Sequence, residues 1–206
     1  MRLYIVRHGE SVANQKKIHG DTTTPLSDLG TQQAHSLRDH LHTIHFHTIY
    51  ASPCTRSQQT AEIINQGLAQ PVTIEQNSLI DEKRGATAFA TLTREEMPWD
   101  IIKAHRHDPN WHYEDEESFN DIQSRVTQFL EQLQSYADDD MVLAVSHHSF
   151  IKHLLLHILL PNSCEPGLFY PIAERLETKN AGITVFEKKQ KYFETTPSWY
   201  MQQWMA

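Results

Sequence analysis

Cysteine is scarce in this sequence of 206 residues, and its scarcity excludes a disulfide framework. Cys54 and Cys164 are the only two cysteines, and neither has the spacing of paired metal ligands, so both thiols are expected to be free. We expect no export signal either, because the first apolar run is far too short for one. These features predict a cytoplasmic protein.

Basic residues are also few, and long hydrophobic runs are absent from the sequence. The 18 lysines and arginines are outnumbered by 26 acidic residues, and the formal net charge is -8, whereas nucleic-acid binding needs basic residues clustered over an extended face. The longest apolar stretch, 150–160, contains Lys152, His153 and His157 and is shorter than the roughly 20 residues of a membrane-spanning helix. We therefore expect a buried helix there, and neither a nucleic-acid nor a membrane partner. Nothing in the sequence indicates an oligomeric state.

Short apolar runs alternate with helical patterns along the chain. We expect helices to begin at Ser27, at Ser52-Pro53 and at Ser118, each followed by apolar residues three and four positions apart. Short hairpin connections are missing between the apolar runs, which favours parallel strands joined by crossover helices. We predict one α/β domain over 1–206, a three-layer sandwich with a mostly parallel central sheet flanked by helices. The five expected strands are 3–6, 48–51, 72–74, 141–145 and 183–186.

Two further segments are rich in aromatic residues. The segment 86–117 combines Trp99, Trp111 and Tyr113 with many charges, and we interpret it as an irregular or helical insertion over the active-site edge of the sheet. Two roles fit it equally: a surface excursion that its aromatics anchor to the core, or a lid that contacts the substrate. The C-terminal Trp199, Tyr200 and Trp204 are expected to pack on the body or on a second subunit.

Polar residues, among them arginines and histidines, follow three of the expected strands. In open parallel sheets, ligands bind outside the carboxyl ends of the strands, so these residues are expected to converge on one pocket. Two guanidinium groups and two imidazoles suit an anionic, tetrahedral group such as a phosphoryl group. The helix expected at Ser52-Pro53 adds a positive dipole end. The first exit supplies Arg7 and His8, the second Ser52 and Arg56, and the third Ser146 and His147.

The sequence holds 14 histidines, and this number raises the question of a metal site. Alternating histidines around a helix end need not face together, and no carboxylate spacing accompanies them in the manner of a metal motif. We therefore predict no metal site and no cofactor. The histidine groups in question are His40, His42, His45 and His47, and His105 and His107.

The same segments carry a resemblance to a known family. As an ordered set they resemble the histidine phosphatase superfamily, in the branch that includes cofactor-dependent phosphoglycerate mutase, over about three quarters of the chain. The motifs are Arg7-His8-Gly9-Glu10-Ser11 with Asn14, Pro25-Leu26-Ser27 with Gly30 and Gln33-Ala34, Ser52-Pro53 with Arg56 and Gln59-Thr60-Ala61-Glu62, and Ser146-His147.

The resemblance implies a metal-independent phosphomonoester hydrolase. His8 would be the nucleophile that forms a phosphohistidine, while Arg7, Arg56 and His147 hold the phosphoryl group. Neutral imidazole suits this role, because it attacks a phosphate ester without the repulsion that an anion would meet. Asn14 would be a further phosphate ligand, or alternatively it caps a loop. The substrate would be a small phosphomonoester or a phosphoprotein.

The proton donor to the leaving group has two candidates in the segment from Leu79 to Gly85. One version of the family spacing selects Asp81, and the version in which a basic pair follows the acid selects Glu82. We choose Glu82, because its longer side chain reaches further and a carboxyl group among phosphate charges is biased toward its protonated form.

Several departures from the family pattern favour hydrolysis over a mutase reaction. His148 replaces the glycine that commonly follows the second histidine of mutases, and the tyrosine-glycine pattern after the acid is missing. The insertion is also poor in arginine for holding a second anionic group. A phosphoglycerate-type mutase, or a phosphate- or phosphoprotein-binding module without catalysis, remain the alternative interpretations.

Overall fold

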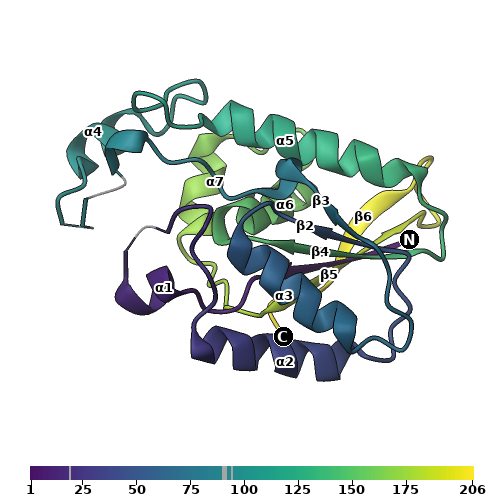
Figure 1. Cartoon of the computed structure of the whole chain (residues 1–206). Helices are drawn as coiled ribbons and strands as arrows, with labels where there is room; N and C mark the ends of the chain where they lie inside the picture. The colour runs from purple at the N-terminus through teal and green to yellow at the C-terminus, as the bar shows by residue number, and fades with distance from the viewer. Residues whose placement is uncertain (19, 90–91, 94) are drawn as a thin grey trace.

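The computed structural model describes residues 1–18, 20–89, 92–93 and 95–206, which build a six-stranded sheet in the order β3-β2-β4-β1-β5-β6 (Figure 1). The strands from β1 to β4 are parallel to one another. The strands are β1 (Arg2–Arg7), β2 (Thr48–Ala51), β3 (Ile74–Gln76), β4 (Met141–Ser146), β5 (Ile183–Lys189) and β6 (Ser198–Gln203).

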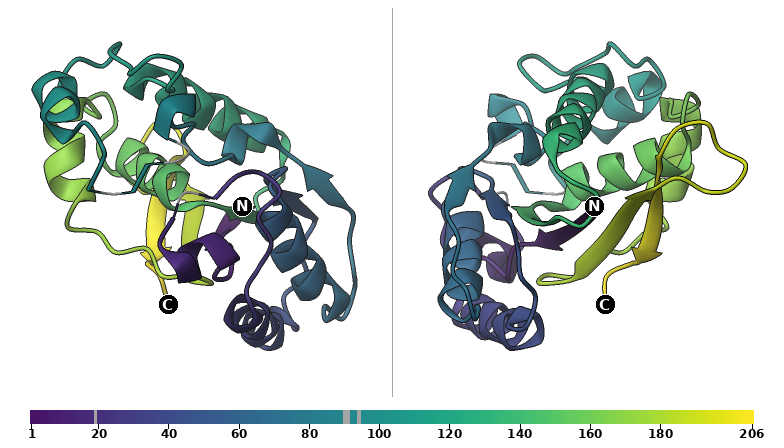
Figure 2. Two further views of the ribbon diagram at one scale, coloured as in Figure 1. Left: turned by 60° about the vertical axis from the view of Figure 1, so that its left-hand side comes forward. Right: turned by 90° about the vertical axis from the view of Figure 1, so that its right-hand side faces the viewer.

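Helices lie on both faces of this sheet. Helices α2 and α3 cover one face, and α5 and α6 cover the other, as the two turned views in Figure 2 show. The prediction of an α/β three-layer sandwich is therefore confirmed. The helices are α1 (Val12–Lys16), α2 (Asp28–Leu41), α3 (Thr55–Gln66), α4 (Trp99–His105), α5 (Phe119–Gln132), α6 (His148–Leu159) and α7 (Pro166–Ala173).

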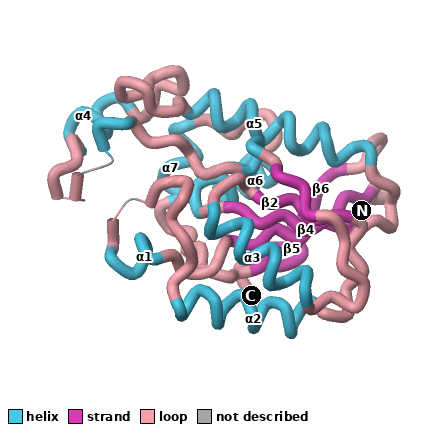
Figure 3. The backbone as a smooth tube through the Cα atoms, viewed as in Figure 1, coloured by secondary structure: helices cyan, strands magenta, loops and turns pink. Residues whose placement is uncertain are grey.

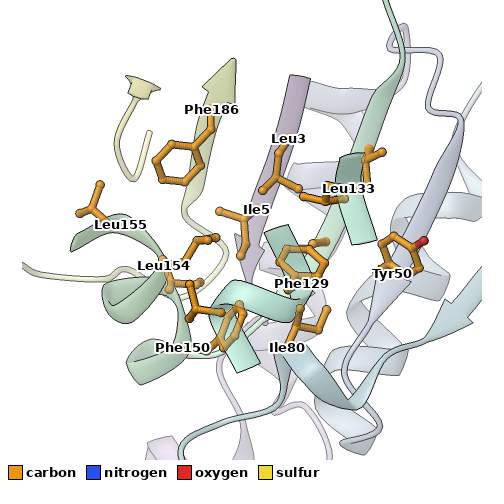
Figure 4. Close-up of a cluster of buried hydrophobic side chains, with 14 of the residues drawn as sticks. Leu3, Ile5, Tyr50, Ile80, Phe129, Leu133, Phe150, Leu154, Leu155 and Phe186 are labelled. Carbon is orange, nitrogen blue, oxygen red and sulfur yellow. The ribbon is translucent and has the colours of Figure 1, made fainter. Parts of the chain in front are cut away.

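The core is densest between β1 and the helices α5 and α6. Leu3 and Ile5 of β1 point toward Phe129 of α5 and Phe150 of α6, and all four side chains are fully buried (Figure 4). Alternate residues of a strand face opposite sides, so neighbouring Val6 packs with α2 and α3 instead. Burial on both sides explains why β1 appears in the sequence as a continuous apolar run.

The edge strand β3 begins two residues later than predicted. Val72 does not enter the sheet, because the side-chain amide of Asn65 bonds both its carbonyl oxygen, at 2.8 Å, and its backbone nitrogen, at 2.9 Å. The strand that pairs with β2 therefore covers Ile74–Gln76.

The fifth strand runs against the direction of the first four. After α7 the chain returns to the carboxyl end of β1, where the backbone nitrogen of Arg7 donates to the carbonyl of Gly182 at 3.2 Å. β5 starts there, and it pairs antiparallel to β1. The expectation of a parallel strand at this position was wrong. It was based only on the lack of a short hairpin connection before the strand, and a long connection can also lead to an antiparallel strand.

β6 was missing from the predicted strands. It pairs antiparallel with β5, and it lies at the sheet edge with partly exposed side chains. An edge strand of this kind lacks the apolar alternation by which a half-buried strand is recognised. Trp199 in β6 and Trp204 just after it pack against the core between β1 and α5, as predicted for packing on the body, whereas the ring of Tyr200 lies against Lys189 and Lys191.

Two of the three predicted helix starts are correct. Ser27 and Ser118 cap α2 and α5, and each side chain accepts a hydrogen bond from the backbone three residues on. The start at Ser52-Pro53 was wrong, since α3 begins at Thr55 with Cys54 as the N-cap residue. The hydroxyl of Ser52 instead bonds side chains from other elements, which are described below.

In the insertion 86–117, the described residues form loops, a short 3-10 turn at Thr87–Phe89 and helix α4. With α1, α7 and several loops it occupies one end of the molecule, at the left of Figure 3, where the parallel strands end. The apolar stretch 150–160 forms most of α6, and its helix is largely buried as predicted. Among the described residues, no helix combines the length and apolar character needed to cross a membrane.

The loop after β1 is held against the start of α2 by two glycines. A Cβ atom added to Gly30 would lie 1.9 Å from the carbonyl oxygen of Glu10, and one added to Gly9 would lie 2.4 Å from the carbonyl oxygen of Gly30. The backbone of Ser27 also donates to Glu10 O at 2.9 Å. This contact sets the position of the loop that contains His8.

We predict that Gly30→Ala lowers the free energy of unfolding by about 2 kcal/mol or more, because two backbone segments must separate to admit a methyl group. Urea denaturation of the whole chain measures this loss. Gly167→Ala is the matched control, since a Cβ atom there meets no atom within 4 Å. Equal stability of the Gly30→Ala and Gly167→Ala proteins would contradict the prediction.

Candidate active site

Three neighbouring strands deliver the candidate residues to one place. β2, β4 and β1 are adjacent in the sheet, and Arg7 pairs with Ser146 in their register. The backbone of His8 donates to Ser146 O at 3.0 Å, and that of Ser52 donates to Val145 O at 3.1 Å. The three strand exits therefore lie at the same level, as the sequence analysis predicted.

His8 is held with its Nε2 atom as an acceptor. Its Nδ1 lies 2.6 Å from the carbonyl oxygen of Gly9 and must donate to it. Nε2 accepts a hydrogen bond from Nε of Arg56 at 3.2 Å, and arginine has only donors. Burial, together with the charges of Arg56 and Arg7, lowers the pKa of His8 to about 3. The imidazole is therefore neutral, with its lone pair directed toward a guanidinium group.

His147 is fixed in the opposite manner. Its Nδ1 accepts from Nη2 of Arg56 at 3.2 Å, so Nε2 bears the proton and donates to the hydroxyl of Ser52 at 2.7 Å. The ring is fully buried, and burial holds the pKa of His147 well below its usual range, with His8 and Arg56 acting in the same direction. The His8 and His147 ring centroids are 5.0 Å apart.

Ser52 connects His147 to an acidic residue. Its hydroxyl donates to Oδ1 of Asp81 at 2.8 Å, and the same oxygen lies 3.4 Å from Nε2 of His147. An anion next to Nδ1 would favour a second proton on the ring of His147. The carboxylate of Asp81, next to Nε2, is placed to stabilise that protonated form. Chemically this is a positioning role for Asp81.

The two arginines of the site have no carboxylate partner in an ion pair among the described residues. Nη1 of Arg7 donates to the carbonyl of Thr178 at 2.6 Å, and Nη1 of Arg56 donates to that of Asp21 at 2.7 Å. Nε of Arg7 is buried, and no described residue bonds it. Burial lowers the pKa of Arg7. Backbone carbonyls orient both guanidinium groups without cancelling their charge, which leaves a positive site for an anion.

Glu82 lies on the other side of the same loop. Its Oε1 accepts from the backbone nitrogen of Ser149, in the first turn of α6, at 2.9 Å and from that of Lys83 at 2.9 Å. Within the described part of the chain, no hydrogen bond reaches Oε2. Glu82 is also close enough to Arg7 to act on its charge. Both acids of the predicted pair are thus at the site, in different surroundings.

Asn14 is further from the reacting groups than the other predicted ligands. It is exposed, and it completes the capping box of α1 with Ser11. Its Oδ1 also accepts from Nδ2 of Asn180 at 3.3 Å, and the same amide nitrogen donates to the carbonyl of His8 at 3.2 Å. The structure thus brings together His8, Arg7, Arg56, His147 and Glu82, while Asn14 reaches His8 through Asn180.

Other residues of the site were not found by sequence reasoning. Thr178 and Asn180 belong to a loop that follows no strand or motif, so no sequence signal marked them. Arg125 braces the acidic loop by donating to the carbonyls of Leu79 at 2.7 Å and Asp81 at 3.0 Å. Arg125 forms an ion pair with buried Glu117 at 2.6 Å. Because Glu117 directly precedes the predicted helix cap Ser118, its position in the sequence could have marked it as a candidate partner.

Two pockets meet at Lys83, next to Glu82. One, of about 500 Å³, is polar and is lined by Arg56, Asp81, Glu82 and the segment 20–22. The other, of about 290 Å³, lies between the insertion and helices α6 and α7. Its aromatic lining consists of Trp99, Trp111, Phe119, Phe169 and Tyr170.

The insertion therefore lines a pocket beside the site. Trp99 and Trp111 face this pocket, whereas Tyr113 does not line it and packs against Phe89, with ring centroids 4.9 Å apart. His148 also lines it, and its Nδ1 is hydrogen-bonded to the hydroxyl of Thr178. Burial, with the charges of Lys152 and Arg7, lowers the pKa of His148 to about 4. It contributes a neutral imidazole at the pocket wall.

Among the described residues, the grouped surface histidines do not form a cluster of three metal ligands. The cluster that does bring three ligand atoms within 4.8 Å of one another consists of Cys54, Asp81 and His147. Burial raises the pKa of the Cys54 thiol to about 11. The thiol donates to Asp81 Oδ1 at 3.2 Å.

Comparison with known proteins agrees with this fold and this arrangement of residues. A family model for the histidine phosphatase superfamily (branch 1) matches residues 3–196. The chain therefore belongs to the histidine phosphatase superfamily, as its motifs indicated.

Relatives of the chain include both phosphatases and mutase-like proteins. It is 28% identical over 166 residues to the adenosylcobalamin/alpha-ribazole phosphatase of Escherichia coli, covering 77% of this chain and 79% of the relative. It is 28% identical over 210 residues to a probable phosphoglycerate mutase of Citrobacter koseri, covering 98% and 91%. A mutant phosphoserine phosphatase of Entamoeba histolytica, solved with phosphoserine, has the same fold, with a TM-score of 0.80, 23% identity and coverage of 100% and 96%.

The lowered pKa of His8 predicts a pH dependence of stability. As the pH falls below 6.5, the ordinary pKa of histidine, His8 of the unfolded chain takes up a proton, whereas folded His8 does so only near pH 3. Stability is therefore complete above pH 6.5 and is lost as the pH falls through this window, by about 1.4 kcal/mol per pH unit for one such histidine.

We accordingly predict that the free energy of unfolding of His8→Asn falls less steeply between pH 6 and 4.5 than that of the unmodified chain, by about 1.4 kcal/mol per pH unit. Urea denaturation at several pH values measures the slopes. Thr60→Val is the control, since it removes two neutral hydrogen bonds next to His8, from the Gly9 N–H at 3.2 Å and to the Arg56 carbonyl at 2.7 Å, and leaves the titrating groups in place. An unchanged slope for His8→Asn would contradict the assignment.

Proposed function

We propose that this protein is a metal-independent phosphomonoester hydrolase that acts through a phosphohistidine on His8. The observation that carries this proposal is a pair of guanidinium groups, of half-buried Arg7 and buried Arg56, which are held by backbone carbonyls beside the lone pair of a neutral histidine. A nucleophile and a positive phosphate site are thus next to each other. Family membership supports the same chemistry.

In the first step, Nε2 of His8 attacks phosphorus and the bond from phosphorus to the ester oxygen breaks. The Gly9 carbonyl accepts a hydrogen bond from Nδ1–H throughout and stabilises the positive charge that develops on the ring. Arg56 must turn its Nε–H from the histidine to a phosphoryl oxygen, where Arg7 and Asn14 also donate. Their charges neutralise the oxygens of the transferring group.

His147 contributes a charge that depends on the substrate. Bound phosphate draws a proton onto Nδ1, which then donates to a phosphoryl oxygen, while the Ser52 hydroxyl and Asp81 stabilise the resulting imidazolium. In the second step, water attacks phosphorus, the bond from phosphorus to nitrogen breaks, and inorganic phosphate leaves. Neutral His8 is regenerated.

Glu82 is the proposed proton donor to the leaving oxygen. Its carboxylate has one oxygen without a hydrogen bond from the described residues, and it lies close to Arg7. In the second step the same carboxylate accepts a proton from the attacking water. Asp81 is the competing candidate, but its Oδ1 already accepts from Ser52, Cys54 and the backbone of Glu82.

The charge balance of the aromatic pocket supports hydrolysis rather than a mutase reaction. Its lining includes three basic residues, Lys83, Arg106 and Lys152, and also three acidic ones, Asp108, Glu116 and Glu174. Arg106 is paired with Glu174 at 2.6 Å, and Lys83 is paired with Glu116. A phosphoglycerate-type mutase must hold a second anionic group. Two of the three basic side chains are already paired with carboxylates, and the third, Lys152, donates to the carbonyl of Ala173 at 2.8 Å.

The same pocket supports a small substrate with an apolar or planar leaving group. A volume of about 290 Å³ between Trp99, Trp111 and Tyr170 accepts a ring-sized group but not a folded protein surface. We further propose that residues 1–206 form one domain around the continuous sheet, and that the enzyme acts in the cytoplasm, as the composition indicated.

Replacement of the nucleophile tests the proposed function. We predict that His8→Ala lowers phosphate release from aryl and alkyl phosphates by about 10³-fold or more. Base-quenched samples of the unmodified enzyme with labelled substrate will contain protein-bound phosphate, and His8→Ala samples will not. Full activity of His8→Ala would disprove the mechanism, whereas tight phosphate binding without turnover over a broad panel would favour the non-catalytic module.

The same panel includes 3-phosphoglycerate. Phosphate release that outpaces isomerisation supports the hydrolase, and the opposite order of rates supports the mutase.

The identity of the proton donor is tested with leaving groups of different acidity. We predict that Glu82→Gln lowers kcat/KM for an alkyl phosphate by about 10²- to 10⁴-fold, but far less for p-nitrophenyl phosphate, whose leaving group departs without a proton. Asp81→Asn, which acts through His147, is expected to affect both substrates alike. The reverse pattern would make Asp81 the donor. kcat/KM is the right quantity, because it reports the first displacement.

A further inference from the structure

Cys54 has no role in the proposed reaction, but it lies beside two residues of the site that do. Its Sγ is 3.2 Å from Oδ1 of Asp81, and that oxygen is 3.4 Å from Nε2 of His147. A thiol, a carboxylate and an imidazole thus present one ligand atom each within 4.8 Å of one another. These are the three ligand types that zinc prefers.

The spacing of these atoms matches a tetrahedral ion. With zinc at about 2.0 Å from nitrogen and oxygen and about 2.3 Å from sulfur, neighbouring ligand atoms are separated by roughly 3.3 to 3.6 Å. The two distances to Asp81 already lie near this range. Sγ of Cys54 and Nε2 of His147 lie within 4.8 Å of each other, so an ion between them has to replace the hydroxyls of Ser52 and Ser57 next to Nε2.

The cluster also has an approach from solvent. Cys54 and Asp81 line the polar pocket of about 500 Å³, and 31% of the Asp81 side chain is exposed. His147 lies behind Asp81 and is fully buried. An ion that enters from the pocket therefore keeps its fourth position toward the pocket, available to water.

We infer that Cys54, Asp81 and His147 form an inhibitory site for a thiophilic divalent cation such as Zn²⁺. Binding releases the thiol proton to solvent and moves the imidazole proton of His147 from Nε2 to Nδ1. It also displaces the Ser52 hydroxyl, which now bonds both residues. The new Nδ1–H then faces Nη2 of Arg56, so two donors oppose each other where a hydrogen bond of 3.2 Å stood.

Inhibition follows from these changes. With its Nε2 bound to the ion, His147 cannot become the imidazolium that the proposed reaction assigns to it, and Asp81, as a ligand of the ion, no longer stabilises that protonated form. Because this consequence rests on the proposed function, the site itself is tested separately from activity.

The activity test is Zn²⁺ inhibition of p-nitrophenyl phosphate hydrolysis in buffer free of phosphate and chelators. The concentration for half-inhibition is expected to rise about tenfold or more in Cys54→Ala, since one of three ligands is lost. Cys164→Ala, at the other free cysteine, is the matched control and keeps the original value. Equal inhibition of all three proteins would assign the effect to surface histidines and overturn the inference.

The spectroscopic test uses Co²⁺ in place of Zn²⁺ and needs no turnover. A near-ultraviolet charge-transfer band from thiolate to cobalt is expected in the unmodified protein and in Cys164→Ala, with one ion bound per chain. Its absence from the unmodified protein overturns the inference, even if Cys54→Ala does not fold. If the band appears while His8→Ala retains activity, the metal site stands and the proposed function fails.

Discussion

Arginine can only donate hydrogen bonds, and the position of Arg56 between two histidines determines the state of the whole site. Nε2 of His8 and Nδ1 of His147 must both be acceptors because they face its guanidinium group. The protons are therefore on the far sides of the two rings, toward the Gly9 carbonyl and the Ser52 hydroxyl. Burial keeps both rings neutral, so each ring directs a lone pair toward one arginine, and the proposed reaction depends on this arrangement.

Sequence reasoning reached the parts of this site that local patterns determine. Arg7, His8 and His147 follow buried strands directly, and parallel strands that are neighbours in a sheet must end at one edge. The capping residues Ser27 and Ser118 are likewise local signals. The family motifs then related these positions to one chemistry.

The remainder depends on tertiary contacts that leave no local pattern. Serine is a typical helix-capping residue, but the hydroxyl of Ser52 bonds Asp81 and His147 from two other segments. Thr178 and Asn180 reach the site only because the chain returns to β1 before β5 begins. The choice between Asp81 and Glu82 is of the same kind, since Asp81 bonds the hydroxyl of Ser52 whereas its neighbour Glu82 bonds the backbone of Ser149 in α6.

The uncancelled charges of Arg7 and Arg56 link binding to folding. The guanidinium groups of half-buried Arg7 and buried Arg56 bond backbone carbonyls, and no described carboxylate forms an ion pair with either, so burial removes hydration that the free protein does not fully replace. An oxyanion in the site supplies that missing partner, and it binds only the folded chain, so occupancy stabilises the fold by mass action. In the proposed reaction the product is inorganic phosphate, itself an oxyanion, so the product is also a ligand that would stabilise the folded chain.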